Sequence, residues 1–213
     1  NVGDCVDVVL TSSLEDARAF HTYSKVNLHI HFVQFDPQAS DGVISGMSFE
    51  QSVRPYTTEL SAPGALTPVG RTLVQAAAAG ATQIAVSDAS RLHVGGAFGI
   101  GLDRANIEIR TITAVDTVNN LVTLDQPLAQ NHVVGEPVGV EFVRYRWYSD
   151  VDSGTVFYHS HVTFTDWYHG LIGAHIIEPS GSTYHHPVTG QPIRSGTVAD
   201  IRTTGVAGNT ASG

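Results

Sequence analysis

The stretch that decides the fold is Gly154-Thr155-Val156-Phe157-Tyr158-His159-Ser160-His161. Its β-branched and aromatic residues predict a β-strand. Side chains on a strand alternate between the two faces, so residues two apart point the same way, with Cβ atoms about 6 to 7 Å apart. The imidazoles of His159 and His161 are therefore expected on one face of the strand.

A second His-x-His pair, His29 and His31, lies far earlier in the chain, in the stretch Val26-Asn27-Leu28-His29-Ile30-His31-Phe32. This stretch also has the composition of a strand, so its two imidazoles share a face. If the two strands are neighbours, four imidazoles meet in one place. Burying such a cluster costs free energy unless a metal or a set of acceptors uses the ring nitrogens. Imidazole binds copper, zinc, iron and nickel, so the residue type alone does not identify the metal.

The composition indicates a globular, water-soluble class of protein. The chain has 213 residues and a net charge of −9, and no run approaches the roughly 18 apolar residues of a membrane span. Nucleic acids and anionic membranes select basic patches, so the negative charge argues against both as partners. The single cysteine, Cys5, lies in a Val-rich run and is expected to be a small buried hydrophobe.

Strand-like runs separated by Gly, Pro, Asp and Ser dominate the chain. They predict an all-β protein, built as an antiparallel sandwich or a barrel. Convincing amphipathic helices are scarce. The runs cover residues 4–11, 26–35, 49–60, 141–161 and 170–178.

The middle of the chain has a different composition. Residues 72–138 contain no Trp or Tyr, and Ala, Val, Ile, Thr and Gly prevail around short β runs. We expect a small all-β module at residues 69–138, inserted into an outer domain at a loop, because loop tips tolerate insertions. The other expected segments are the outer domain at 1–68 and 139–180, and a loop or linker tail at 181–213.

With the insert removed, the outer domain resembles the first cupredoxin domain of multicopper oxidases. That family typically shows Gly-Thr-x-x-Tyr-His-Ser-His, then Gly-Leu-x-Gly and a hydrophobic strand that ends in Glu-Pro. The later motifs here are Gly170-Leu171-Ile172-Gly173 and Glu178-Pro179, and Asp41-Gly42 stands about ten residues after His31, as in the family. The resemblance covers most of the chain outside the insert. The tail is similar to that of the large bacterial members, which include manganese-oxidising enzymes.

The resemblance implies a cupredoxin-like Greek-key sandwich and a role for each motif residue. It implies that His29 binds a type 2 copper, set apart from His31, His159 and His161, which would bind a coupled type 3 pair. Asp41 would be the catalytic acid, which hydrogen-bonds copper-bound water and relays protons while the trinuclear cluster reduces dioxygen to water. The family also implies an extracellular or periplasmic location.

The sequence departs from the family pattern in two ways. The first pair reads His29-Ile30-His31-Phe32, where the family usually has His-Trp-His-Gly. A trinuclear cluster uses twice as many histidines as this domain supplies, and the His-Cys-His segment that provides the others and the type 1 copper is absent from the sequence. We therefore expect an oxidase that is incomplete in this chain alone. Further cupredoxin domains or subunits would complete it, and its electron donor is not identified by the sequence.

Two other functions fit parts of the pattern. A mononuclear-metal enzyme of the cupin kind would use one His-x-His pair with a carboxylate, and Asp36 is the nearest acid after the first pair. A non-catalytic cupredoxin-like structural or adhesion domain would bind no metal. Asp41 fits a turn-forming Asp-Gly equally well. His169 and His175 are left out of the ligand set, because single histidines in strands are usually packed and hydrogen-bonded.

Overall fold

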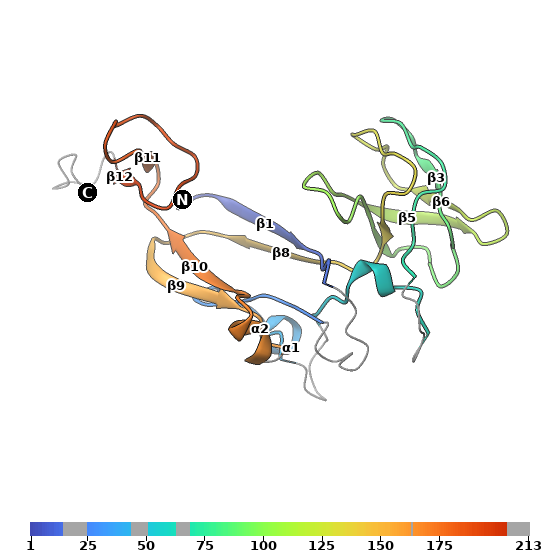
Figure 1. Cartoon of the computed structure of the whole chain (residues 1–213), viewed down its shortest axis with the longest axis horizontal. Coiled ribbons are helices and arrows are strands. Elements are labelled where there is room, and N and C mark those ends of the chain that lie inside the picture. The colour runs from blue at the N-terminus through green and yellow to red at the C-terminus, as the bar shows by residue number, and fades with distance from the viewer. Residues whose placement is uncertain (15–24, 44–50, 63–68, 163, 204–213) are drawn as a thin grey trace.

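The computed structural model describes residues 1–14, 25–43, 51–62, 69–162 and 164–203. The protein is mostly β, with 37% strand and 6% helix, and its sheets are antiparallel, which confirms the all-β class (Figure 1). The Greek-key connectivity and the domain boundaries stay predictions. No helix within the described ranges is long and apolar enough to cross a membrane.

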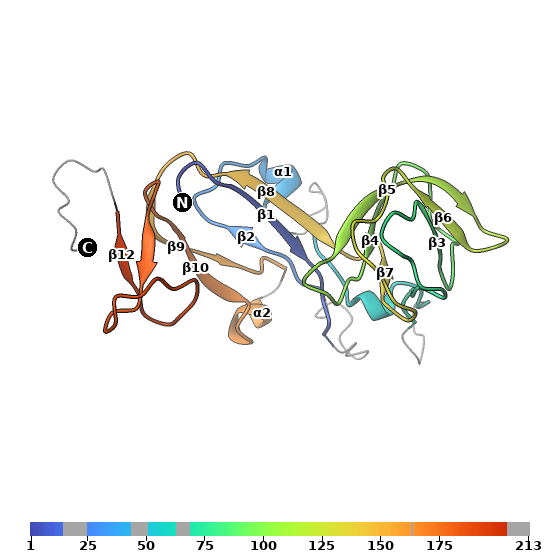
Figure 2. The same cartoon turned by 90° about the horizontal axis from the view of Figure 1, so that it is seen from above.

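Two sheets form the part of the molecule that carries the histidine motifs (Figure 2). The first pairs β1 (Cys5–Leu10) with β8 (Val143–Tyr148). The second has the order β10-β9-β2, and its strands are β2 (His29–Ile30), β9 (Ser153–His159) and β10 (Ile172–Ile177). The sheets face each other, since the ring centroids of Trp147 on β8 and His175 on β10 are 5.6 Å apart.

A five-stranded sheet occupies the opposite end of the molecule (Figure 1). Its order is β3-β6-β5-β4-β7. The strands are β3 (Gln83–Ala85), β4 (Ala97–Ile100), β5 (Glu108–Asp116), β6 (Leu121–Leu124) and β7 (Val138–Gly139). Among the described residues, every buried member of its apolar core lies between Leu73 and Val138. This sheet therefore has a core made by its own stretch of chain.

A short helix follows each of the two histidine pairs. Helix α1 (Pro37–Ser40) ends directly before Asp41, and the side chain of Asp36 caps its first turn by accepting the Gln38 N–H. Helix α2 (Phe164–Tyr168) begins three residues after His161. Both helices thus place residues beside the strand ends that carry the imidazoles.

The structure differs from the sequence-based expectations in three places. The described part of the predicted run 49–60 has only single bridges and the short 3-10 helix η2 (Tyr56–Thr58), because Pro55 lacks an N–H for a strand ladder. Cys5 is exposed, not buried, since it lies on the outward face of β1. The tail predicted as loop or linker contains the antiparallel pair β11 (Thr183–His185) and β12 (Asp200–Arg202), whose backbone groups satisfy each other.

A buried ion pair attaches the five-stranded sheet to the chain segment before it. The guanidinium of Arg71 is 1% exposed and donates to the carboxylate of Glu59 and to the Ser90 carbonyl, the latter at 3.1 Å. Burial raises the pKa of Glu59, and the neighbouring charge of Arg71 only partly opposes this. Glu59 also accepts the Val140 N–H at 3.3 Å, so one carboxylate connects both ends of the inserted stretch.

A second buried network is centred on His132, which is 2% exposed. Its Nδ1 lies 2.7 Å from Glu136 Oε2, and its Nε2 lies 3.1 Å from Glu108 Oε1. Glu108 also accepts the N–H groups of Ala129 and Gln130, both at 2.8 Å. The network therefore holds the connection between β6 and β7 against β5.

Replacing His132 with Ala is expected to lower the free energy of unfolding by about 3–5 kcal/mol, because two buried carboxylates lose a shared partner. Denaturant unfolding of the whole chain measures the change. The matched control is His93→Ala, at an exposed position of the same sheet region, with an expected change within about 0.5 kcal/mol. Equal effects of the two substitutions would contradict the structural role of His132.

The same network predicts a loss of stability in acid. Burial tends to raise the pKa of Glu108 and Glu136, but hydrogen bonds from His132 and from backbone N–H groups outweigh it, so both pKa values lie below 4.5. Their stabilisation is complete above about pH 4.5 and is lost as the pH falls through the lower folded-state pKa values. Unfolding free energies measured from about pH 6 to about pH 3 are expected to decline, and to decline less steeply in Glu108→Gln. If the unfolding free energy of Glu108→Gln declined with pH as steeply as that of the wild type, the acid sensitivity would not come from this network.

Candidate metal centre

The antiparallel pairing of β2 with β9 brings the two histidine pairs together. His29 stands directly opposite His159 in the register. The centroid of the His29 ring lies 4.3 Å from that of His161, 4.8 Å from His31 and 5.2 Å from His159. The centroid of His159 lies 5.1 Å from that of His161 and 5.2 Å from that of His31. The four imidazoles therefore form one cluster.

The ring positions do not separate His29 from the other three histidines, and its assignment to a type 2 copper stays a prediction. Its ring is in contact distance of all three partners. The reason is the register, because a residue directly opposite His159 on the same face has the His31 and His161 rings as its neighbours. The geometry alone does not distinguish a separate type 2 position.

Backbone carbonyls orient three of the four imidazoles. The Nδ1 atoms of His29 and His161 lie 2.9 and 3.0 Å from the carbonyl oxygen of Asp41. The Nδ1 atom of His159 lies 2.8 Å from the Ser160 carbonyl oxygen. A carbonyl oxygen only accepts, so each Nδ1 carries the hydrogen and each Nε2 presents its lone pair. This is the arrangement in which an outer hydrogen bond fixes the ring of a metal-binding histidine.

Two ring nitrogens are spaced as if to share one ion. The Nε2 atoms of His31 and His159 are 3.1 Å apart. When two imidazole nitrogens bind the same tetrahedral metal ion at about 2.0 Å, the two nitrogens are about 3.3 Å apart. The His31 ring also stacks on Phe157, with centroids 4.0 Å apart, which restrains its position.

The carboxylate of Asp41 faces the same Nδ1 atoms as its own carbonyl. Its Oδ2 is 3.0 Å from Nδ1 of His161, and its Oδ1 is 3.6 Å from Nδ1 of His29. Its side chain is 27% exposed, so it is in contact with solvent as well. It also accepts the Val43 N–H at 3.3 Å, so the predicted turn role and a role at the centre coexist in one residue.

Asn27 is a part of this centre that the sequence did not single out. It is fully buried, donates from Nδ2 to the Gly42 carbonyl at 2.7 Å, and accepts the His161 N–H at 2.7 Å. It therefore connects the start of β2, the Asp41-Gly42 turn and the second histidine pair. Gly42 has φ of 89°, and an added Cβ would lie 2.8 Å from Asn27 Nδ2, so glycine fits this close approach. The available signal was an Asn between Val and Leu in an apolar run, since a buried amide needs partners.

A layer of side chains from α2 lies behind the second pair. Ser160 is fully buried, and its hydroxyl donates to Asp166 Oδ2 at 2.6 Å. The indole N–H of Trp167 donates to the Ser160 carbonyl, and its ring centroid lies 3.9 Å from that of His159. These residues fix the turn in which the two histidines stand.

Burial keeps the cluster in the form that binds metals. It lowers the pKa of His29 and His159, an effect that the Asp41 and Ser160 carbonyls oppose and that the neighbouring imidazoles reinforce. Metal ions bind the neutral imidazole, so a lowered pKa extends binding to lower pH. Protons therefore compete less with a metal ion for His29 and His159 than they would for an exposed histidine.

The two histidines left out of the ligand set lie elsewhere. His175 is on the inner face of β10 against Trp147, whereas the cluster is on the outer face of the same sheet. His169 is exposed in the turn after α2. Neither belongs to a described group of potential metal donors.

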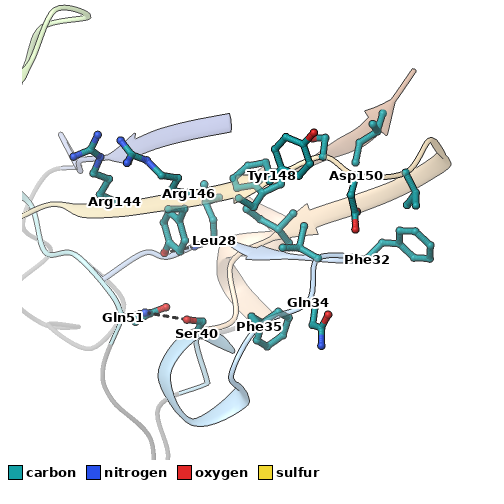
Figure 3. Close-up of a pocket in the computed structure, with 17 residues that line it drawn as sticks. Leu28, Phe32, Gln34, Phe35, Ser40, Gln51, Arg144, Arg146, Tyr148 and Asp150 are labelled. Atoms are coloured by element: carbon teal, nitrogen blue, oxygen red, sulfur yellow. Dashed lines mark hydrogen bonds between the residues drawn. The ribbon is translucent and has the colours of Figure 1, made fainter. Parts of the chain in front are cut away.

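A separate cavity of about 590 Å³ lies between β8 and the chain that follows β2 (Figure 3). Its described lining contains no histidine, and its one carboxylate belongs to Asp150. Its wall mixes apolar side chains such as Leu28, Phe35 and Ile177 with polar ones such as Gln51, Arg144 and Arg146. The cavity therefore offers no ligand set for a metal.

The interpretation of the centre depends on its own geometry. Comparisons of the chain with protein-family models, curated proteins and solved structures found no match. Within the described residues, two groups of potential donors share His29, and the donor atoms of each group lie within 4.8 Å of one another. The groups are His29 with His31 and His159, and His29 with Asp41 and His161. Binding of a metal by these residues stays a prediction.

Replacing Asn27 with Ala is expected to leave the Gly42 carbonyl and the His161 N–H buried without partners, at a cost of about 1–3 kcal/mol each. Thermal unfolding in the absence of metal measures the loss. Asn106→Ala, at an exposed position, is the control and is expected to change little. A stability of Asn27→Ala equal to that of the control would contradict the connecting role of Asn27.

Proposed function

We propose that this chain is part of a multicopper oxidase and supplies half of the histidine ligands of a trinuclear copper cluster that reduces dioxygen to water. The observation that carries the proposal is the cluster of four imidazoles, three of them with Nε2 lone pairs held by Nδ1-to-carbonyl hydrogen bonds. The resemblance of the motifs to the first cupredoxin domain adds the identity of the metal. Membership of the large bacterial type, which includes manganese-oxidising enzymes, and an extracellular or periplasmic location rest on that resemblance alone.

The donor set fits copper. Imidazole nitrogen is a ligand that copper accepts readily, and the 3.1 Å spacing of the His31 and His159 Nε2 atoms suits two bonds to one ion. A type 1 copper needs a thiolate with two histidines. The only cysteine, Cys5, pairs with Tyr148 across β1 and β8 and has no histidine in its stretch of sequence. The type 1 site therefore belongs to another domain or chain in this proposal.

Each residue of the centre has a distinct task in the proposed reaction. Bound copper would pass to dioxygen the electrons that a donor delivers at the partner. His29, His31, His159 and His161 hold the metal, and the Asp41 carbonyl keeps two of these rings in orientation. The Asp41 carboxylate, partly exposed and next to His161, is placed to exchange protons between solvent and the centre.

The face around the cluster supports completion by a partner. Phe157 stands two residues before His159, and Ile172 stands directly opposite it, so both lie on the cluster's side of the sheet. They are 40% and 48% exposed. An apolar surface beside half a ligand set suits further cupredoxin domains or subunits that bring the remaining histidines. Dioxygen would then react at the closed interface, and the electron donor would act at the partner.

A mononuclear site is the second candidate, and the group of His29, Asp41 and His161 favours it. Two imidazoles and one carboxylate form a donor set used by non-haem metal enzymes. The number of ions bound per chain with its partner separates the functions: several coppers for the oxidase, one metal for the mononuclear enzyme, none for a structural domain.

Copper titration of the chain alone tests the proposal. We expect weak Cu²⁺ binding without intense blue absorption and without sustained oxygen consumption, because half the ligands and the thiolate site are missing. His159→Ala is expected to weaken binding by about 10- to 100-fold. Binding is expected to weaken in acid as imidazoles protonate, at a pH below the ordinary imidazole pKa of about 6.5, because burial lowers the pKa of His29 and His159.

The control for this titration is His93→Ala, at an exposed position remote from the cluster in sequence, which is expected to bind like the wild type. Absence of binding to the wild-type chain, or binding unaffected by His159→Ala, would overturn the assignment of the ligands. Intense blue absorption from this chain alone would show that the electron entry site has been misplaced.

A further inference from the structure

Asp166 on α2 is a buried carboxylate placed behind the second histidine pair. Its residue is 9% exposed. Its Oδ2 accepts the Ser160 hydroxyl at 2.6 Å, and Ser160 stands between His159 and His161 in the chain. The next residue, Trp167, packs its ring against His159. The carboxylate is thus separated from the imidazole pair by a single serine.

Asp166 differs from every other buried carboxylate of the described residues in having no cationic partner. Each of the others forms an ion pair with an arginine. These pairs are Glu59–Arg71, Glu108–Arg110, Glu136–Arg104 and Glu141–Arg54. The hydrogen bond described for the Asp166 carboxylate comes from a neutral hydroxyl, and no described ion pair includes this residue.

We infer that Asp166 is the counter-charge for the metal held by His159 and His161, acting through Ser160 without being a ligand. A buried carboxylate without a cation is costly, and a positive ion on the far side of Ser160 reduces that cost. The inference rests on the proposed metal centre and adds a residue to it. The coupling is reciprocal: if Asp166 strengthens metal binding, the bound metal stabilises the buried charge of Asp166 by the same free energy.

The inference makes the metal-free and metal-bound forms respond in opposite directions to one substitution. Asp166→Asn retains an oxygen that accepts the Ser160 hydroxyl, but it removes the charge. Without metal, the variant is expected to be at least as stable as the wild type, because an unpaired buried charge has been removed. With metal, it is expected to bind about 10- to 100-fold more weakly, the range for residues that support ligands. A residue that only anchors α2 would show a loss of metal-free stability and no loss of affinity.

The experiment uses the whole 213-residue chain and Cu²⁺ as the probe. Affinity is measured by competition with a chelator, and the thermal midpoint is measured with and without Cu²⁺. The variants are Asp166→Asn and Ser160→Ala, and the control is Asp152→Asn, which removes the same charge at an exposed position. Ser160→Ala keeps the charge but deletes its hydrogen bond, so it is expected to lower the metal-free midpoint.

The outcomes separate the two proposals. Failure of the wild-type chain to bind Cu²⁺ overturns the metal centre itself. If the wild type binds and Asp166→Asn binds like Asp152→Asn, the centre stands and the counter-charge role is wrong. A metal-free Asp166→Asn that is unfolded or clearly less stable than the wild type also refutes that role. A stable Asp166→Asn with weakened Cu²⁺ affinity and a smaller Cu²⁺-induced rise in the thermal midpoint supports it.

Discussion

The register between β2 and β9 is the constraint on which the candidate centre depends. His29 meets His159 only in this register, and a slip of β2 by one residue would turn the His29 imidazole to the other face of the sheet, away from His159. On the inner face, the same register sets Ile30 of β2 opposite Tyr158 of β9. The histidine face and the core face of β9 therefore depend on the same strand pairing.

Buried polar groups connect the pieces that the strands alone leave separate. Asn27 fastens the Asp41-Gly42 turn to the second histidine pair, and Ser160 fastens that pair to α2. Each of these groups would be costly if left without a partner, so the folded chain must provide a partner for all of them. This explains how a two-residue strand, β2, can hold two imidazoles in defined positions.

Strand alternation and the spacing of motifs were enough to predict the all-β class and the histidines that meet. They were not enough for Asn27 or Asp166, because the partners of these residues come from a turn and a helix whose approach no local pattern encodes. The run 49–60 was wrongly assigned because its Val, Tyr and Thr residues, which favour strands, hid the effect of Pro55 on pairing. The pair β11 and β12 was missed because two three-residue strands separated by a long Gly- and Pro-rich connection have almost no periodic signal.

The orientation of His29 and His161 is encoded in the main chain at position 41, since one carbonyl oxygen receives both Nδ1 atoms. Every amino acid has that carbonyl, so the aim of these two rings is largely insensitive to which side chain evolution places there. The side chain can therefore be selected for its acidity and for its hydrogen bond to the Val43 N–H without changing the carbonyl that orients the two rings. The orientation of the two rings and the acidity at position 41 can therefore change independently in evolution.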